Sequence, residues 1–172
     1  MKIGSGFEAV FKSVIRGGAM AAKKKFRVQK VLFPTDFTGA SIHAAAYALS
    51  LAESYKAKLF VVHVVETAHE ARGFYLPHLP YDKMDEEMVE SANGMLKRFA
   101  NMRFKGYNNI ELRVLEGEPY KEILKVISGN DIDMVVMGTF GKARLDRVIF
   151  GSTTERVMRK SACPVLVVPP PR

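Results

Sequence analysis

From residue 29 onward, short apolar runs alternate with longer segments in which apolar residues recur every three or four positions. The short runs are typical of buried strands, and the longer periodic segments are typical of helices that bury one face. The pattern predicts strands at residues 30–33, 59–65, 110–115, 133–137 and 165–168. It predicts helices at residues 41–55, along a stripe from Met84 to Phe99, after Pro119, and from Ser152 onward.

Strands that alternate with helices indicate β-α-β units and therefore a parallel sheet. We expect a single doubly wound α/β domain with a five-stranded parallel sheet, strand order 3-2-1-4-5 and helices on both faces. The second run is apolar on both faces apart from His63, which we interpret as a hydrogen-bonded core residue. The letters Ser152-Thr153-Thr154-Glu155 match a capping box, which predicts Ser152 as the cap of the last helix.

The net charge of +8 is unevenly distributed along the 172 residues. Residues 1–30 hold eight Lys and Arg against one Glu, a net charge of +7, and the remainder holds 18 basic and 17 acidic residues. The body of the protein is therefore close to neutral, which removes the main support for nucleic-acid binding by the domain. We divide the chain into a basic N-terminal extension, residues 1–28, and a folded domain, residues 29–172.

The extension contains one apolar stripe at helical spacing: Phe7, Val10, Phe11, Val14 and Ile15. One interpretation is a basic amphipathic helix that contacts an anionic membrane surface. The alternatives are a helix packed on a partner subunit, a disordered tail, or a chain that starts at Met20.

The rest of the composition is typical of a globular protein. No apolar run approaches the roughly 20 residues that span a bilayer, and the N-terminus lacks the pattern of a secretory signal. The single cysteine, Cys163, precludes an internal disulfide and a cysteine-cluster metal site. We expect a cytoplasmic protein.

Three glycines follow the predicted fourth strand. Gly138 and Gly141 stand where the backbone is expected to approach a ligand or to adopt a positive φ. Gly151 and Ser152 stand at a helix start, where free N–H groups and the helix dipole favour a phosphate. The nine residues between, 142–150, carry three basic side chains and one acidic one. The plain alternatives are a turn residue for Gly138, a loop residue for Gly151 and a helix cap for Ser152, so the spacing by itself leaves nucleotide binding open.

A second candidate position is Asp36, directly after the predicted first strand. In an open α/β sheet, ligands bind beyond the carboxyl ends of the strands, where the strand order reverses. In the expected strand order the first and fourth strands are neighbours, so Asp36 and Gly138 would share one crevice. An aspartate in this position is, taken alone, more often a turn or cap residue, and Asp36 is the only acidic residue that we place there.

These motifs resemble the universal stress protein family. The resemblance rests on G-x2-G-x9-G-S at residues 138–152, on the first-strand sequence 30–36, on His63-Val64 and on the final strand 162–169. It covers residues 29–169, and the glycine pattern is the one that marks the ATP-binding branch of that family. The resemblance implies an adenine-nucleotide site, with ATP or AMP as ligand and Mg²⁺ as a candidate companion of ATP. The residues implied in binding are Pro34, Thr35, Asp36, Val64, Met137, Gly138, Gly141, Gly151, Ser152 and Thr153.

In that resemblance, Pro34, Thr35 and Asp36 border adenine and ribose, and Val64 contacts the adenine through its backbone. Met137 lies against the base or sugar, and the glycines with Ser152 and Thr153 enclose ribose and phosphates. The resemblance also implies a homodimer that forms through the edge strand Val165, Leu166, Val167 and Val168.

Other nucleotide folds fit poorly. The first turn, residues 34–38, lacks G-x-G-x-x-G, and residues 141–143 lack the glycine and hydroxyl spacing of a P-loop. With no base evident beside Asp36, we assign no catalytic residue and favour a stress-response sensor or regulator with little or no turnover. Two alternatives stay open: a slow ATP hydrolase or nucleotide-activating enzyme of the same architecture, and an interaction module whose site is vestigial.

Overall fold

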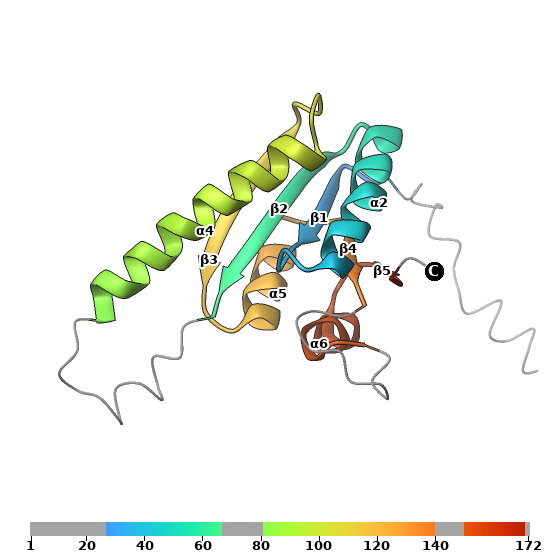
Figure 1. Ribbon diagram of the computed structural model, residues 1–172. Helices are drawn as coiled ribbons and strands as arrows, with labels where there is room; N and C mark the ends of the chain where they lie inside the picture. Colours follow the sequence, from blue (N-terminus) through green and yellow to red (C-terminus); the bar gives the residue numbers. More distant parts are fainter. Residues whose placement is uncertain (1–26, 67–80, 140–149, 171–172) are drawn as a thin grey trace, which may run out of the picture.

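The computed structural model describes residues 27–66, 81–139 and 150–170 (Figure 1). The predicted glycine Gly141 and most of the basic extension lie outside these residues. The elements in chain order are β1 (Lys30–Pro34), α2 (Gly39–Tyr55), β2 (Lys58–Val65), α4 (Tyr81–Arg103), β3 (Ile110–Glu116), α5 (Pro119–Gly129), β4 (Met134–Gly138), α6 (Ser152–Lys160) and β5 (Val165–Val168).

The five strands form one parallel sheet in the order β3-β2-β1-β4-β5, which confirms the predicted fold. The carboxyl ends of all the strands therefore meet at one edge. The chain moves outward from β1 to β2 and β3, and then returns to the other side of β1 with β4. The strand order reverses between β1 and β4. In sheets of this kind, ligands bind beyond the carboxyl ends of the two strands at this point.

Helices cover both faces of the sheet (Figure 1). On one face α2 and α4 pack over the odd-numbered positions of β1, Val31 and Phe33. On the other face, α5 and α6 both contribute to the cluster that buries Leu32. Because each central strand is buried on both sides, its sequence is a continuous apolar run, as the sequence pattern indicated.

Small side chains bring α2 close to the sheet. Its inner face consists of alanines that are at most 1% exposed: Ala44, Ala45, Ala48 and Ala52. The helix begins at Gly39, two residues before the predicted start, because Thr38 acts as the N-cap and its side chain accepts a hydrogen bond from the Ser41 N–H. This cap fixes the short turn between β1 and α2 at the carboxyl edge.

The described chain enters the core at Val28, within the segment that we assigned to the extension. Val28 is 3% exposed and belongs to the core cluster beneath α2 and α4. Within the described residues, we find no helix that combines the length and the apolar character needed to cross a membrane.

Candidate functional site

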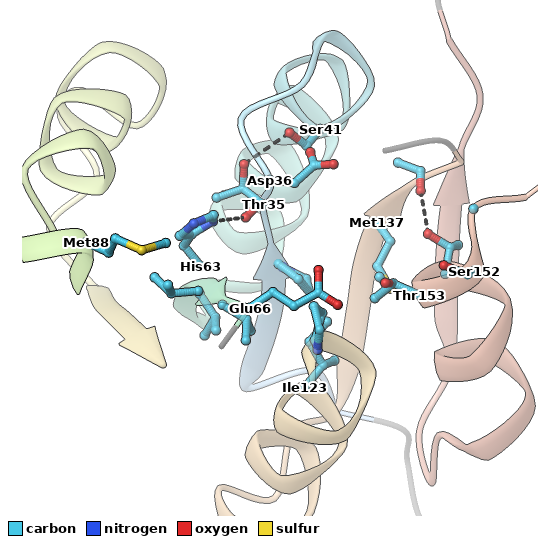
Figure 2. Close-up of a pocket in the computed structure, with 18 residues that line it drawn as sticks. Thr35, Asp36, Ser41, His63, Glu66, Met88, Ile123, Met137, Ser152 and Thr153 are labelled. Carbon is cyan, nitrogen blue, oxygen red and sulfur yellow. Dashed lines mark hydrogen bonds between the residues drawn. The ribbon is translucent and has the colours of Figure 1, made fainter. Parts of the chain in front are cut away.

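A pocket of about 500 Å³ lies at the carboxyl edge of the sheet (Figure 2). Its walls come from the ends of β1, β2 and β4, from the first turns of α5 and α6, and from one side chain of α4. Nine of the ten residues predicted from the sequence line it: Pro34, Thr35, Asp36, Val64, Met137, Gly138, Gly151, Ser152 and Thr153. The tenth, Gly141, lies outside the described residues. The structure brings these residues together, and their role in binding a nucleotide stays a prediction.

The turn after β1 is held by its own side chains. Thr35 is buried, and its hydroxyl donates to the Ser41 hydroxyl at 3.1 Å and accepts from the Phe37 N–H at 3.1 Å. Oδ1 of Asp36 accepts hydrogen bonds from the N–H and hydroxyl of Thr38, at 3.1 and 2.6 Å. Asp36 therefore does stabilise a turn, as its plain interpretation required. Both of these bonds use Oδ1, and Asp36 also lines the pocket.

Packing against α2 gives Gly138 a reason to be glycine that the sequence did not indicate. A Cβ atom there would lie 2.9 Å from the backbone carbonyl of Ala40 and 3.1 Å from the Ser41 nitrogen. Gly138 is not among the residues with positive φ in the described chain. The close approach of the first turn of α2 therefore requires glycine here, and an approach of the ligand to Gly138, which lines the pocket, stays a prediction.

The start of α6 also differs from the prediction. Gly151 is the N-cap, with φ −67° and ψ 153°, and no side chain caps the helix. Ser152 is therefore the first helical residue, and the predicted capping box is wrong. The hydroxyl of Thr154 instead donates to the Gly138 carbonyl at 3.0 Å, which ties α6 to the end of β4.

The N–H groups at this helix start are not equivalent. The N–H of Gly151 donates to the Thr139 carbonyl at 2.6 Å, so it is not free for a phosphate, contrary to our expectation. The first bond inside the helix runs from the Glu155 N–H to the Gly151 carbonyl. The N–H groups of Ser152, Thr153 and Thr154 precede it and have no partner within the helix. An anion would be bound by these three groups.

His63 forms part of the pocket wall, where the sequence indicated a core residue. Its Nδ1 lies 2.8 Å from the Thr35 carbonyl oxygen (Figure 2). The His63 ring also packs on that of Phe37, with the ring centres 4.5 Å apart. Because a carbonyl only accepts, Nδ1 must carry the proton of this hydrogen bond. The predicted hydrogen-bonded state is correct, but His63 is only half-buried and lines the pocket.

The pocket holds a second acidic residue that we did not predict there. Glu66 follows the last residue of β2 and lines the pocket together with Asp36 (Figure 2). Our statement that Asp36 is the only acid in the crevice is therefore wrong. Within the described chain, we find no group of three or more His, Cys, Asp or Glu side chains that could hold a metal ion.

Eight further residues line the pocket without having been predicted as binding residues: Ser41, Val62, His63, Val65, Met88, Pro119, Ile123 and Thr154. Val62, His63 and Val65 flank the predicted Val64, so the strand end alone could have indicated them. Met88 and Ile123 come from helix faces whose position over the strand ends is set by tertiary packing.

An ion pair joins the two helices on one side of the pocket. Glu118, the N-cap of α5, contacts the Arg156 guanidinium of α6 at 2.6 Å and the Lys121 ammonium at 3.0 Å. The hydrogen bond from Lys121, with the charges of both cations, holds the pKa of Glu118 below its usual value. Arg156 also lies over the Tyr120 ring, 4.8 Å from its centre. These contacts fix the first turn of α5 beside α6.

Comparisons with known proteins all identify the same family. Residues 27–169 match the universal stress protein family. A universal stress protein of Methanocaldococcus jannaschii is 31% identical over 167 residues, covering 95% of this chain and 91% of the relative. A second one from the same organism is 26% identical, covering 81% of this chain and 94% of the relative. The structure of a universal stress protein from Lactobacillus plantarum superimposes with a TM-score of 0.66 at 25% identity, covering 83% of this chain and 98% of that one.

Proposed function

Because the chain belongs to the universal stress protein family, we propose that it binds an adenine nucleotide, ATP or AMP, in the pocket at the carboxyl edge. In this proposal the protein acts in the cytoplasm as a sensor or regulator of the stress response, with little or no turnover of nucleotide. One observation carries the proposal: the Asp36 carboxylate and the amino terminus of α6 meet in a single pocket at the switch point of the sheet.

The chemistry of the pocket suits the three parts of a nucleotide. Val64, Ile123 and Met137 present apolar surface, which favours a purine ring. At the β1 turn, Asp36 offers a carboxylate that can accept hydrogen bonds from ribose hydroxyls (Figure 2). On the α6 side, Ser152 and the residues after it offer N–H groups and the positive end of the helix dipole to phosphates.

The size of the pocket agrees with such a ligand. Sites for small molecules and cofactors range from about 300 to 1,000 Å³, and this pocket has about 500 Å³. Two proteins of similar fold have been solved as complexes, one with cAMP and one, from Archaeoglobus fulgidus, with dAMP. They are 23% and 18% identical to this chain, with TM-scores of 0.63 and 0.57, so the likeness concerns the fold. The proposal therefore rests on the residues of the pocket.

Glu66 supports a second candidate function, slow hydrolysis of ATP. Hydrolysis needs a group that positions water, and usually carboxylates that help to hold Mg²⁺ with the phosphates. Asp36 and Glu66 are two carboxylates on one pocket, where the sequence had indicated only one. A single-turnover assay with radiolabelled ATP distinguishes the candidates. In the hydrolase the product accumulates, and Glu66→Gln slows it, whereas in the sensor ATP is recovered intact.

The first test of the main proposal is direct. Nucleotide released by denaturing the purified full chain is identified by mass spectrometry, and ATP and AMP are titrated by calorimetry. We expect AMP or ATP in the released fraction and saturable binding of at least one of them. A folded protein that binds neither nucleotide at millimolar concentration contradicts the proposal.

The second test uses Asp36→Asn. Asparagine retains an oxygen that can accept from the Thr38 N–H, so the turn should persist, but it lacks the charge that strengthens hydrogen bonds to ribose. We expect the substitution to weaken the binding free energy of the nucleotide by about 1.5–3 kcal/mol. The matched control is Asp131→Asn, an exposed residue with φ 48° before β4, a conformation that asparagine tolerates. Equal affinities in the two variants would place the ligand elsewhere.

A further inference from the structure

The outer surface of α4 carries a second apolar row beside the one that packs on the sheet. The buried row consists of Ala92, Leu96, Phe99 and Ala100. The second row is Met88, Met95 and Met102, at intervals of seven residues, with exposed fractions of 40%, 41% and 72%. Residues seven apart lie on the same side of a helix. We call these three residues the methionine row.

Charge is distributed unevenly along this helix. Its first ten residues, 81–90, contain five acidic side chains and one lysine, and Glu86, Glu87 and Glu90 are exposed. The acidic part of α4 therefore lies beside Met88, at the pocket end of the methionine row. An apolar strip flanked by exposed carboxylates suits a basic amphipathic segment.

The row connects the pocket to the point where the chain enters the domain. At one end Met88 extends from α4 towards His63 at the pocket (Figure 2). The helix then runs back over the sheet (Figure 1). It ends at Arg103, a short connection before β3 begins at Ile110, so its last turn with Met102 lies near the amino edge of the strands. Val28 lies at this edge, in the same core cluster as Phe99 and Phe104 of the α4 region.

We propose that the N-terminal segment Phe7–Ile15 of the same chain binds along the methionine row. Its stripe of Phe7, Val10, Phe11, Val14 and Ile15 matches the row in apolar character. Residues 1–26 contain six basic side chains and one acidic one, opposite in charge to the first turns of α4. Methionine side chains adapt readily to the shape of a partner, which suits an intramolecular docking surface.

The length of the chain permits this arrangement. Val28 follows Ile15 by 13 positions, and an extended chain of that length spans up to about 45 Å. From Met102 to Met88 the helix rises only about 21 Å. The segment can therefore reach the whole row without displacing Val28 from the core.

A relative shares part of this segment. The match to the Methanocaldococcus jannaschii protein covers 95% of this chain. Residues 27–172 make up less than 95% of the 172 residues, so they cannot account for the whole match. The match therefore extends into residues 1–26. This supports a role for the segment within the folded protein, and the proposal does not depend on which ligand occupies the pocket.

Oxidation of the methionines tests the proposal. The full chain is treated with dilute hydrogen peroxide, and sulfoxide formation at each methionine is followed by mass spectrometry. In Phe11→Asp/Val14→Asp, two charges interrupt the apolar stripe. We expect Met88 and Met95 to oxidise several times faster in this variant than in the unmodified chain. Met158, on α6 at the opposite face of the sheet, serves as the internal reference.

The matched control is Ala9→Asp/Ser13→Asp, which adds the same charge to the same segment but leaves the stripe intact. We expect its oxidation rates at the methionine row to remain close to those of the unmodified chain. Identical rates at Met88 and Met95 in the unmodified chain and the stripe variant overturn the proposal. So does protection that disappears on dilution, since that indicates docking from a second copy.

Vesicles with anionic lipid address the membrane alternative. The membrane alternative predicts that the unmodified chain binds such vesicles and that the stripe variant does not. It also predicts that, without vesicles, the two chains oxidise at the same rate. This combination of results means that the segment contacts a membrane and that the proposal is wrong. If the stripe variant alone loses protection in vesicle-free solution, the segment docks on its own domain.

Discussion

The backbone carbonyl group of Ala40 lies only 2.9 Å from the position that a Cβ atom on Gly138 would occupy. The end of β4 thus passes the first turn of α2 at a distance that only glycine allows. Gly138 lines the pocket, as does Ser41 next to Ala40. This contact therefore sets how closely the two sides of the switch point approach each other.

Substitution Gly138→Ala tests this contact. The clash is with backbone atoms, which cannot rotate away, so α2 or β4 must shift. We expect the free energy of unfolding to fall by about 1–3 kcal/mol, the usual cost of overpacking, measured by urea denaturation. Gly39→Ala is the control, because a Cβ there meets nothing within 4 Å. The explanation fails if the two variants are equally stable.

The first helical position of α6 allows a sharp test of phosphate binding. Ser152 is the first residue of the helix, a position where proline is favoured because its missing N–H has no helical partner. Gly151, with φ −67° and ψ 153°, already has the conformation that precedes proline. Ser152→Pro should therefore preserve the fold while it removes one N–H and one hydroxyl from the pocket.

If the Ser152 N–H binds a phosphate, Ser152→Pro lowers the affinity for ATP by about 1.5–3 kcal/mol, as expected for a hydrogen bond to a charged group. Ser152→Ala removes only the hydroxyl, so the difference between the variants isolates the N–H. Calorimetric titration measures both, and thermal unfolding checks the fold. Equal affinities for ATP in the two variants would exclude the N–H as a phosphate ligand.

The fold class could be predicted because its causes are local. Runs such as 59–65 are short, apolar and bounded by helical periodicity, and β-α-β connections leave few topologies. The residues at the strand ends, among them Asp36 and Val64, could be placed at the pocket for the same reason. Parallel strands bring their carboxyl ends to one edge whatever the packing details are.

The start of α6 could not be predicted in this way. The letters S-T-T-E at 152–155 are compatible with a cap at Ser152 or one residue earlier. The choice depends on bonds to β4, from Thr154 to Gly138 and from Gly151 to Thr139. Glu66 directly follows the predicted strand 59–65, so the rule that applies to Asp36 and Val64 could also have indicated this second acid.

The edge strand β3 carries an ion-pair network that makes stability depend on pH. Glu111 accepts a hydrogen bond from Lys58, with the two atoms 2.6 Å apart, and also contacts Arg113. The hydrogen bond from Lys58, followed by the hydrogen bond and charge of Arg113, lowers the pKa of Glu111 from its ordinary 4.5. Both cations lie over the Phe60 ring, at 5.1 and 5.2 Å from its centre.

Because the folded state lowers this pKa, the ion pair stabilises the fold above pH 4.5, and the contribution is lost as the pH falls through the lower folded value. Glu111→Gln should cost about 0.5 kcal/mol at neutral pH, since the pair is partly exposed to solvent. The difference from the unmodified chain should shrink below pH 4.5 in urea titrations. Glu116→Gln, an exposed residue on the same strand, is the control. A difference that stays constant with pH contradicts this assignment.

The two edges of the sheet differ in a way that bears on dimerisation. The β3 edge presents the charged side chains of Glu111 and Arg113, which discourage pairing with another strand. The β5 edge is Val-Leu-Val-Val, and Leu166 is 39% exposed. An apolar edge strand invites pairing with a second copy, so we expect a two-fold homodimer that forms through Val165–Val168.

Leu166→Glu places a charge on this edge, and its two copies would lie close together across a two-fold axis. We expect the unmodified chain to sediment as a dimer at micromolar concentration and Leu166→Glu to sediment as a monomer with an unchanged circular dichroism spectrum. Met102→Glu introduces the same charge at an exposed residue on α4, on the far side of the sheet from β5, and should leave the dimer intact. A dimer that persists in Leu166→Glu and dissociates in Met102→Glu would move the interface from β5 to α4, because a charge disrupts association only where it is buried against the partner.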